Sequence, residues 1–421
     1  MNVLAFILGL SLWVDRAPFF PGAYVAPLSV VIAGLALIPI TLIKRINIPL
    51  PLVPMLLAFW LTSLGVLSLT WEPYYGIHVS ERFASFSRQL IALWGGIALM
   101  NVVAVLSSSE LTRRSLALGV MAGGIVSSIG GLFPRVRGLF GLSNFPDRAS
   151  GFATEPAHFA TMLVIFGLPF AAALLGGARW AKLMGLVGLL IYTLGIALSQ
   201  SAVGFFLTTV WMVVYLFAGL SKFIGHSNKT SPAASRLFLL ALLPIIFSAI
   251  LAWRKPEYTI TQLGAVLGGQ ATVSFWDRVG GFIGGFIFWL HDPLSLLGYG
   301  LGGHGYRIAE LLPQELANHI LSVKSKAFPA LNSLVGRAMS DGGVIAFLLL
   351  IVIFLQGIVK AQKAGGPFVA TWITVFFAVT IGGQGSWSSP ILWFWFAFLT
   401  HHQQRRRWHE GCHRRRAYLE A

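Results

Sequence analysis

Long apolar runs alternate with short polar connections along the whole chain. Runs that approach or reach the length of a membrane span lie at 2–14, 23–43, 49–70, 88–107, 115–133, 156–176, 180–199, 202–219, 235–252, 344–360, 366–383 and 386–401. A helix needs about 20 apolar residues to cross the hydrocarbon core of a bilayer. The pattern therefore predicts an all-α polytopic membrane protein with about twelve transmembrane helices, within a range of roughly 11 to 14.

Composition agrees with this class of protein. Of the 421 residues, 56% are hydrophobic and 10% are charged, and the mean hydropathy is +0.77. Soluble domains carry about 25% charged residues. The formal net charge of +16 could indicate a nucleic-acid partner, but the cations lie in short connections and in the tail 402–421. Cytoplasmic loops of membrane proteins are rich in lysine and arginine, so we expect no nucleic-acid partner. The single cysteine, Cys412, excludes disulfides as an organising feature.

The basic residues also predict an orientation. They occupy every second connection: Lys44 and Arg45, Arg113 and Arg114, Arg179 and Lys182, Lys222 to Arg236, and Lys360 and Lys363. Positive connections face the cytoplasm, so the sequence predicts a multi-pass protein of the cytoplasmic (inner) membrane with both termini cytoplasmic.

Four regions follow from this topology. Residues 1–252 hold the first nine helices and an extracytoplasmic loop at 134–155. Residues 253–343 form a long extracytoplasmic loop with amphipathic helices, 344–401 hold the last helices, and 402–421 form a basic cytoplasmic tail. Within the long loop, the apolar stretch 279–290 is too short to span, which predicts an interfacial or re-entrant helix. Trp387, Trp393 and Trp395 suit an aromatic belt at the membrane interface.

A first cluster of polar residues precedes the helix that is expected from 156. It contains Arg135, Arg137, Asp147, Arg148, Glu155 and His158. Pro156 suits the first turn of a helix, which would make Glu155 its N-cap. Two interpretations stay open. Glu155 only caps the helix while Arg148 reaches the lipid headgroups, or Glu155 is a base while arginine clamps a phosphate.

A second cluster extends from Arg254 to Asp341. It includes Asp277-Arg278, His291, the string from Gly298 to His304, Arg307, Asn332-Ser333, Arg337 and Asp341. The glycine string lacks the lysine and preceding strand of a nucleotide loop, so it is interpreted as a backbone approach to a ligand or as a plain bend. His291 and His304 are not spaced as metal ligands, and the sequence reveals no carboxylate partner for them. We therefore expect no metal and no cofactor.

Several ordered motifs resemble the O-antigen polymerase and O-antigen ligase superfamily of bacterial envelope enzymes. They are Arg148-x-x-Gly-Phe-x-x-Glu-Pro, Ser199-Gln-Ser-Ala-Val-Gly, Arg278 before an amphipathic helix, Pro293-Leu-x-x-Leu-Gly-Tyr-Gly, and Asn332-Ser-Leu followed by Gly342-Gly343. Their order and spacing match over residues 145–360, and the predicted topology agrees.

The resemblance implies a metal-independent, inverting glycosyltransferase whose donor is an undecaprenyl-diphosphate-linked glycan. It implies that Arg148 and Arg278 offset charge on the leaving diphosphate and that Glu155 or His304 takes the acceptor proton. Arg135, Arg137, His158, Tyr299, Arg307, Asn332 and Arg337 are the candidate substrate-binding residues. The expected partners are the lipid-linked donor and acceptor, the bilayer and a chain-length regulator.

Two departures bear on the choice of reaction. Ligases of the superfamily have histidine where this chain has Leu331, which favours a polymerase over a ligase. Gln200-Ser201 replaces the usual Ser-Arg of the second motif, so the role of that corner stays open.

Two other classes of function also stay open, namely a lipid or solute transporter and a structural partner in an export complex. The spans carry almost no charge at mid-membrane depth, which disfavours an ion-driven carrier.

Overall fold

The computed structural model describes ten ranges of the chain. They are 1–14, 27–44, 51–70, 79–132, 149–153, 155–175, 179–224, 273–323, 330–382 and 384–400. Within these ranges the regular structure is entirely helical and contains no strand. The expected all-α class is confirmed for this part of the chain.

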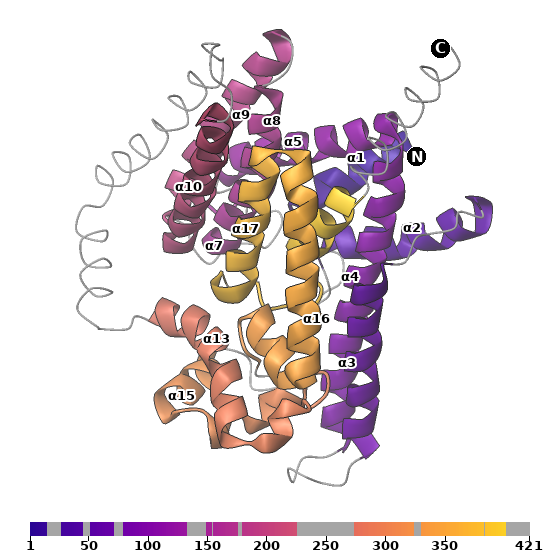
Figure 1. The fold of residues 1–421 in the computed structure, drawn as a ribbon, viewed down its shortest axis with the longest axis vertical. Coiled ribbons are helices and arrows are strands. Elements are labelled where there is room, and N and C mark those ends of the chain that lie inside the picture. Colours follow the sequence, from indigo (N-terminus) through magenta and orange to yellow (C-terminus); the bar gives the residue numbers. More distant parts are fainter. Residues whose placement is uncertain are drawn as a thin grey trace.

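The helices cover the apolar runs of the described residues, although α4 and α16 begin nine and ten residues before the runs 88–107 and 344–360. Figure 1 shows how they are arranged. The first half contains α1 (Asn2–Ser11), α2 (Leu28–Lys44), α3 (Leu52–Thr70), α4 (Val79–Ser108), α5 (Glu110–Leu132), α7 (Pro156–Met162), the π-helical turn η1 (Leu163–Gly167), α8 (Leu168–Leu174), α9 (Arg179–Ser199) and α10 (Ala202–Ile224). The second half contains α13 (Val273–His291), the 3₁₀ turns η2 (Pro293–Leu296) and η3 (Gly303–Arg307), α14 (Ile308–Leu311), α15 (Gln314–Val323), α16 (Leu334–Ala364), α17 (Gly366–Ile381) and a last helix, Pro390–Thr400. The expected span at 235–252 lies outside the described residues.

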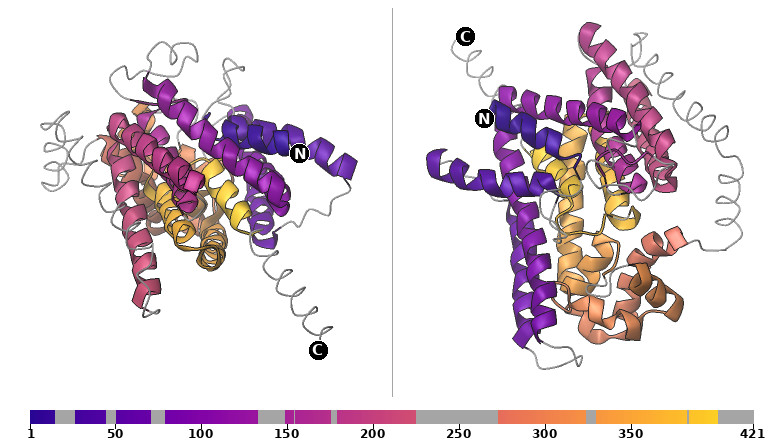
Figure 2. Two further views of the ribbon diagram at one scale, coloured as in Figure 1. Left: turned by 90° about the horizontal axis from the view of Figure 1, so that it is seen from above. Right: turned by 180° about the vertical axis from the view of Figure 1, so that it is seen from behind.

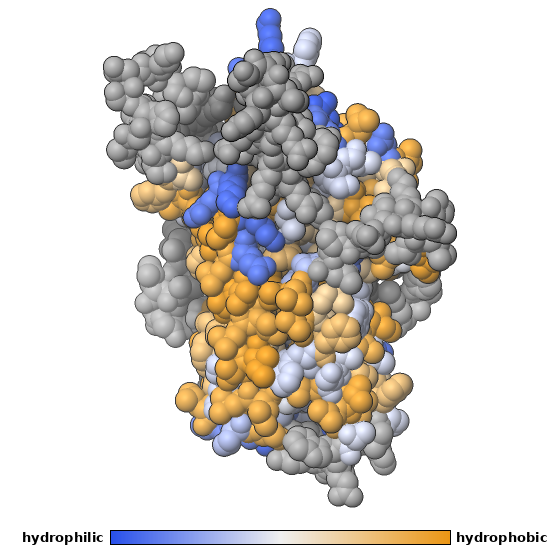
Figure 3. Space-filling view, turned by 45° about the vertical axis from the view of Figure 1, so that its right-hand side comes forward, coloured by the Kyte–Doolittle hydropathy of each residue, from blue (hydrophilic) through white to orange (hydrophobic). Residues whose placement is uncertain are grey.

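Five helical stretches among the described residues are long and apolar enough to cross a membrane. They are Leu52–Thr70, Arg82–Ser108, Pro156–Leu174, Arg179–Ser199 and Leu334–Ala364. Large apolar side chains such as Phe59 on α3 and Leu348 on α16 are more than half exposed, and apolar residues cover much of the face shown in Figure 3. Water would oppose such a surface and lipid would not, so the structure is that of a membrane protein.

Helices α1, α2 and α5 run crosswise to α3, α4 and α16 in all the views of Figures 1 and 2. Small residues explain how closely α1 and α5 approach each other. A Cβ added to Gly9 would collide with the backbone of α5, and one added to Gly119 would collide with the Phe6 carbonyl group. Glycine at both positions lets the two backbones pack directly, as in many membrane helix pairs.

The last helix, 390–400, lies in the centre of the bundle. Its residues from Pro390 to Leu399 are all buried. The expectation of an aromatic belt at the membrane interface is wrong. Trp387, Trp393 and Trp395 are completely buried in protein and contact no lipid. Their indole rings fill the core, because the surrounding helices cover this short helix on all sides.

Helix 390–400 runs parallel to the α7–η1–α8 stretch. Phe166 packs against Phe394 with ring centroids 5.3 Å apart, and one turn later Phe170 packs against Phe398 at 5.6 Å. The residue numbers increase together along both helices, so their N-terminal ends point the same way. The start of α7 at Pro156 therefore lies on the same side of the bundle as the segment 384–389.

Candidate functional site at a broken helix

Helix α16 is interrupted near its beginning. Gly343 has φ 63° and ψ −156°, outside the helical region, so residues 334–342 form a short helix before the longer one. Every residue of this short helix is buried. Ser333 caps its N-terminus by accepting a hydrogen bond from the Gly336 N–H at 3.1 Å. Asn332 and Ser333 therefore directly precede this buried half-helix (residues 334–342), which carries Arg337 and Asp341 one turn apart.

The glycine string caps the other end of the half-helix. The N–H groups of Tyr299 and Gly300 donate to the Ser340 and Asp341 carbonyl oxygens at 2.9 and 2.8 Å. Two tryptophans complete the cap: the Trp289 indole donates to the Met339 carbonyl group and the Trp60 indole donates to Gly342, each at 2.8 Å. Four carbonyl groups that a helix end leaves without partners are thus satisfied inside the protein.

Three alternate glycines make this cap possible. Gly298, Gly300 and Gly302 all have φ between +77° and +102°, a conformation that side chains oppose. A Cβ at Gly298 would lie 2.5 Å from the Asp341 carbonyl oxygen, and one at Gly300 would lie 2.6 Å from the Leu64 carbonyl oxygen. The string is therefore a helix cap fitted between α3 and α16.

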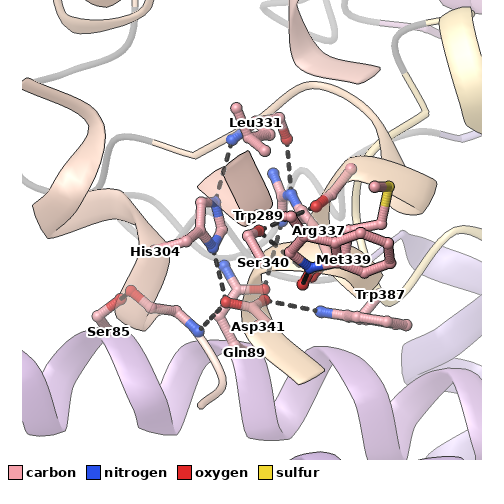
Figure 4. A network of polar contacts seen from close by, with 12 residues as sticks. Ser85, Gln89, Trp289, His304, Leu331, Arg337, Met339, Ser340, Asp341 and Trp387 are labelled. Carbon is pink, nitrogen blue, oxygen red and sulfur yellow. Dashed lines mark hydrogen bonds and ion pairs between the residues drawn. The ribbon is translucent and has the colours of Figure 1, made fainter. Parts of the chain in front are cut away.

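His304 and Asp341 form the centre of the site (Figure 4). The Nδ1 atom of His304 lies 2.6 Å from the Asp341 Oδ1 atom, and the Leu331 N–H donates to Nε2 at 3.1 Å. Nε2 is therefore an acceptor and Nδ1–H the donor. The Gly302 N–H and the Trp387 indole also donate to the Asp341 carboxylate, at 3.1 and 3.3 Å. Both ring nitrogens of His304 are engaged and only 1% of the residue is exposed. His304 therefore holds the end of the glycine string against the half-helix.

Arg337 is the buried cation of this site. Its Nε–H donates to the Leu331 carbonyl oxygen at 2.7 Å, and one terminal nitrogen donates to the Gln89 side chain on α4 at 3.4 Å. Only 8% of the residue is exposed. Asp341 lies one turn further along the same half-helix, so the two charges balance each other. A buried arginine of this kind is a candidate for binding an anion.

A smaller polar network lies beside the cap. The Tyr299 hydroxyl donates to Asp292 Oδ2 at 2.6 Å, and Arg307 donates to the same oxygen at 3.2 Å. Burial acts to raise the pKa of the Asp292 carboxyl group, but the bonds from Tyr299, the Leu294 N–H and Arg307 together hold this pKa below its ordinary value. Tyr299 and Arg307 thus fix the turn between α13 and the glycine string.

At the first cluster, Glu155 is the N-cap residue of α7 and Pro156 is its first helical residue, as the sequence predicted. The Glu155 side chain is exposed and makes no capping hydrogen bond. His158 lies in the first turn and is partly buried. Glu155 thus occupies the N-cap position without a capping hydrogen bond, and its role as a base stays a prediction.

The expected short helix at 279–290 is part of α13. Its glycines face backbone on both sides of the start of the half-helix: a Cβ on Gly281 would lie 2.9 Å from the Asn332 nitrogen, and one on Gly285 would lie 2.9 Å from the Gly336 Cα. Glycine is needed here because α13 packs directly against backbone. Arg278 lies in the first half of α13, but its side chain is outside the described residues. Arg135, Arg137 and Arg148 are also outside them.

Sequence reasoning left several members of the site unassigned. It found no carboxylate for His304, whereas Asp341 is that partner. It assigned no role to Gln89 on α4, and it placed Trp387 at the membrane interface. A polar residue in an apolar run was the available signal for Gln89. Among the described residues, no group of His, Cys, Asp or Glu could hold a metal ion.

No model of a known protein family matches the chain, and no curated protein sequence matches it significantly.

Proposed function

We propose that the protein is a glycosyltransferase of the cytoplasmic membrane that polymerises undecaprenyl-diphosphate-linked repeat units of a bacterial polysaccharide at the outer face. The proposal includes the topology of about twelve spans with cytoplasmic termini. It rests on the ordered motifs that resemble the O-antigen polymerase and ligase superfamily. The observation that carries it furthest is that Glu155, at the start of α7, and the segment 384–389 beside the Arg337 half-helix lie on the same side of the bundle.

In the proposed reaction, Glu155 and the two arginines each have one role. The acceptor hydroxyl oxygen attacks the anomeric carbon of the donor, Glu155 takes the hydroxyl proton, and the bond between that carbon and the diphosphate oxygen breaks. Undecaprenyl diphosphate leaves with the bonding electrons, and the configuration is inverted. Arg148 and Arg278 offset the charge that grows on the diphosphate, so the transfer needs no metal.

The structure favours Glu155 over His304 as the base. Both nitrogens of the buried His304 ring are engaged, whereas the Glu155 carboxylate is exposed and makes no cap bond. His304 and Tyr299 then act by positioning the half-helix and its arginine.

The test uses purified protein in vesicles with a lipid-diphosphate-linked repeat unit and no added metal or nucleotide. Wild type should give a ladder of polymer. Arg148→Ala, Arg278→Ala and Glu155→Gln should abolish it while the proteins still insert. Arg114→Ala is the matched control, because Arg114 is an exposed surface cation paired with Glu110. Normal ladders from the first three variants would refute the proposal.

A second candidate, translocation of a lipid or solute, has one observation in its favour. The half-helix 334–342 is a discontinuous element of the kind that forms transporter binding sites. Counterflow of labelled substrate across sealed vesicles, without polymer formation, would favour this candidate. Transfer of glycan to a different acceptor in the same assay would favour a ligase.

A further inference from the structure

The segment 384–389 is polar and buried inside an apolar bundle. Gln384, Ser388 and Ser389 are 9%, 4% and 2% exposed. The hydroxyl groups of Ser386 and Ser388 pair with each other at 2.7 Å. Irregular polar backbone at this depth occurs in membrane proteins where it is buried in protein or lines a site. The sequence had placed most of this segment, from 386 onward, in the last expected span.

Two polar atoms of this segment have no hydrogen-bond partner among the described residues. They are the amide nitrogen Nε2 of Gln384 and the hydroxyl Oγ of Ser389. Leaving a buried donor unpaired costs free energy, and native proteins seldom retain one unless something completes it. The amide nitrogen can only donate, so the missing partner of Gln384 is an acceptor.

The Ser389 hydroxyl lies at the N-terminus of helix 390–400. Ser389 directly precedes Pro390, the first helical residue, so it occupies the N-cap position. The first-turn N–H groups of a helix have no acceptor within the helix, and this end of the helix carries partial positive charge. Helix and hydroxyl together therefore offer donors toward one place, where an anion is stabilised.

Arg337 adds a full positive charge near the start of the segment 384–389. A Cβ on Gly385 would lie 2.9 Å from the Leu331 carbonyl oxygen, which is the oxygen that accepts the Arg337 Nε–H bond. Gln384 is the neighbouring residue of Gly385. The nearby Asp341 carboxylate opposes an anion, but His304, Gly302 and Trp387 all donate to it. The unpaired amide nitrogen on the Arg337 side of the segment, Gln384 Nε2, is thus a donor.

We propose that Gln384, Ser389 and the N-terminus of helix 390–400 form, with Arg337, an anion subsite for a phosphate group. The Gln384 amide nitrogen, the first-turn N–H groups and the Arg337 guanidinium donate, and the Ser389 hydroxyl is able to donate, which favours phosphate oxygens over sugar hydroxyls. The identity of the ligand as a lipid-linked diphosphate rests on the proposed function. Inorganic pyrophosphate and anionic phospholipid share its chemistry.

The test measures binding to the full-length protein in nanodiscs with three probes: undecaprenyl diphosphate, inorganic pyrophosphate and phosphatidylglycerol. Gln384→Glu replaces the donor by a carboxylate and should raise the Kd for the preferred probe by about tenfold or more. Ser389→Ala should raise it by a smaller factor. Asn101→Leu and Ser29→Ala are matched controls, since each removes another buried polar group with an unpaired atom, on α4 and α2. Melting temperatures establish that each variant is folded.

The outcomes separate this proposal from the proposed function. If lipid diphosphate binds far more tightly than the other two probes, the subsite binds the substrate. If pyrophosphate or phosphatidylglycerol binds most tightly, the subsite exists but its ligand is a free phosphate or a lipid headgroup. Unchanged Kd values in folded Gln384→Glu and Ser389→Ala proteins would overturn the subsite even if polymer forms. Binding that depends on both residues, without polymer from wild type, would retain the subsite and reject the polymerase.

Discussion

The Nδ1 atom of His304 and the Oδ1 atom of Asp341 lie 2.6 Å apart, and neither side chain is more than 1% exposed. The pair joins the glycine string to the broken helix of α16. Because the Leu331 N–H occupies the other ring nitrogen, the histidine connects three backbone segments at once.

Removal of one member of this pair should strongly destabilise the fold. His304→Ala or Asp341→Ala leaves a buried polar group without its partner, at a cost of about 3–5 kcal/mol. Titration with SDS in mixed micelles measures the free energy of unfolding. The double variant should cost less than the sum of the single variants, because the second change removes the group that the first left unpaired. Strict additivity would mean that the two side chains do not interact.

Alanine at Gly300 should also destabilise the protein. The positive φ costs an L-residue roughly 1–2 kcal/mol, and the new Cβ would lie 2.6 Å from the Leu64 carbonyl oxygen. The same titration measures the change. Gly34→Ala is the control, since no atom lies within 4 Å of its added Cβ and alanine favours a helix by about 1 kcal/mol. Equal stability of both variants would contradict the capping role of the glycine string.

Replacement of Arg337 by lysine should reduce polymer formation without unfolding the protein. Lysine keeps the charge but cannot reach both the Leu331 carbonyl group and the Gln89 side chain with a planar fork. The polymer assay and the melting temperature, measured together, separate the two effects. Gln89→Leu should weaken activity less, because it removes only the longer bond. Wild-type activity in Arg337→Lys would show that charge alone suffices there.

The turn at Asp292 should loosen in acid. Its folded pKa lies below the ordinary value of about 3.9, so its contribution to stability is complete above that value and is lost as the pH falls through the folded pKa. Proteolysis of the turn between α13 and α14 across pH 2–6, with an acid-active protease, measures this loss. Asp292→Asn should flatten the pH dependence, and Tyr299→Phe should move the transition toward the ordinary pKa. An unchanged profile in Asp292→Asn would assign the transition to other carboxyl groups.

The sequence by itself determined that the chain is an all-α membrane protein and where most of its helices lie. Hydrophobic runs and helix-start signals such as Glu155-Pro156 act over a few residues, so local physics suffices to find them. The glycines of the 298–302 string were visible as well, although their sequence neighbours could not reveal which helix end they cap.

Only the tertiary structure decided which polar residues meet. Asp341 follows His304 by 37 positions, and Gln89 precedes Arg337 by 248; contacts over such separations depend on how whole helices pack. The same reason explains Trp387 and the last helix. Apolar composition suits both a lipid-facing surface and a protein core, because hydrocarbon and packed side chains solvate an apolar group alike. Whether such a helix lies at the edge or in the centre therefore depends on its neighbours, and here they surround it.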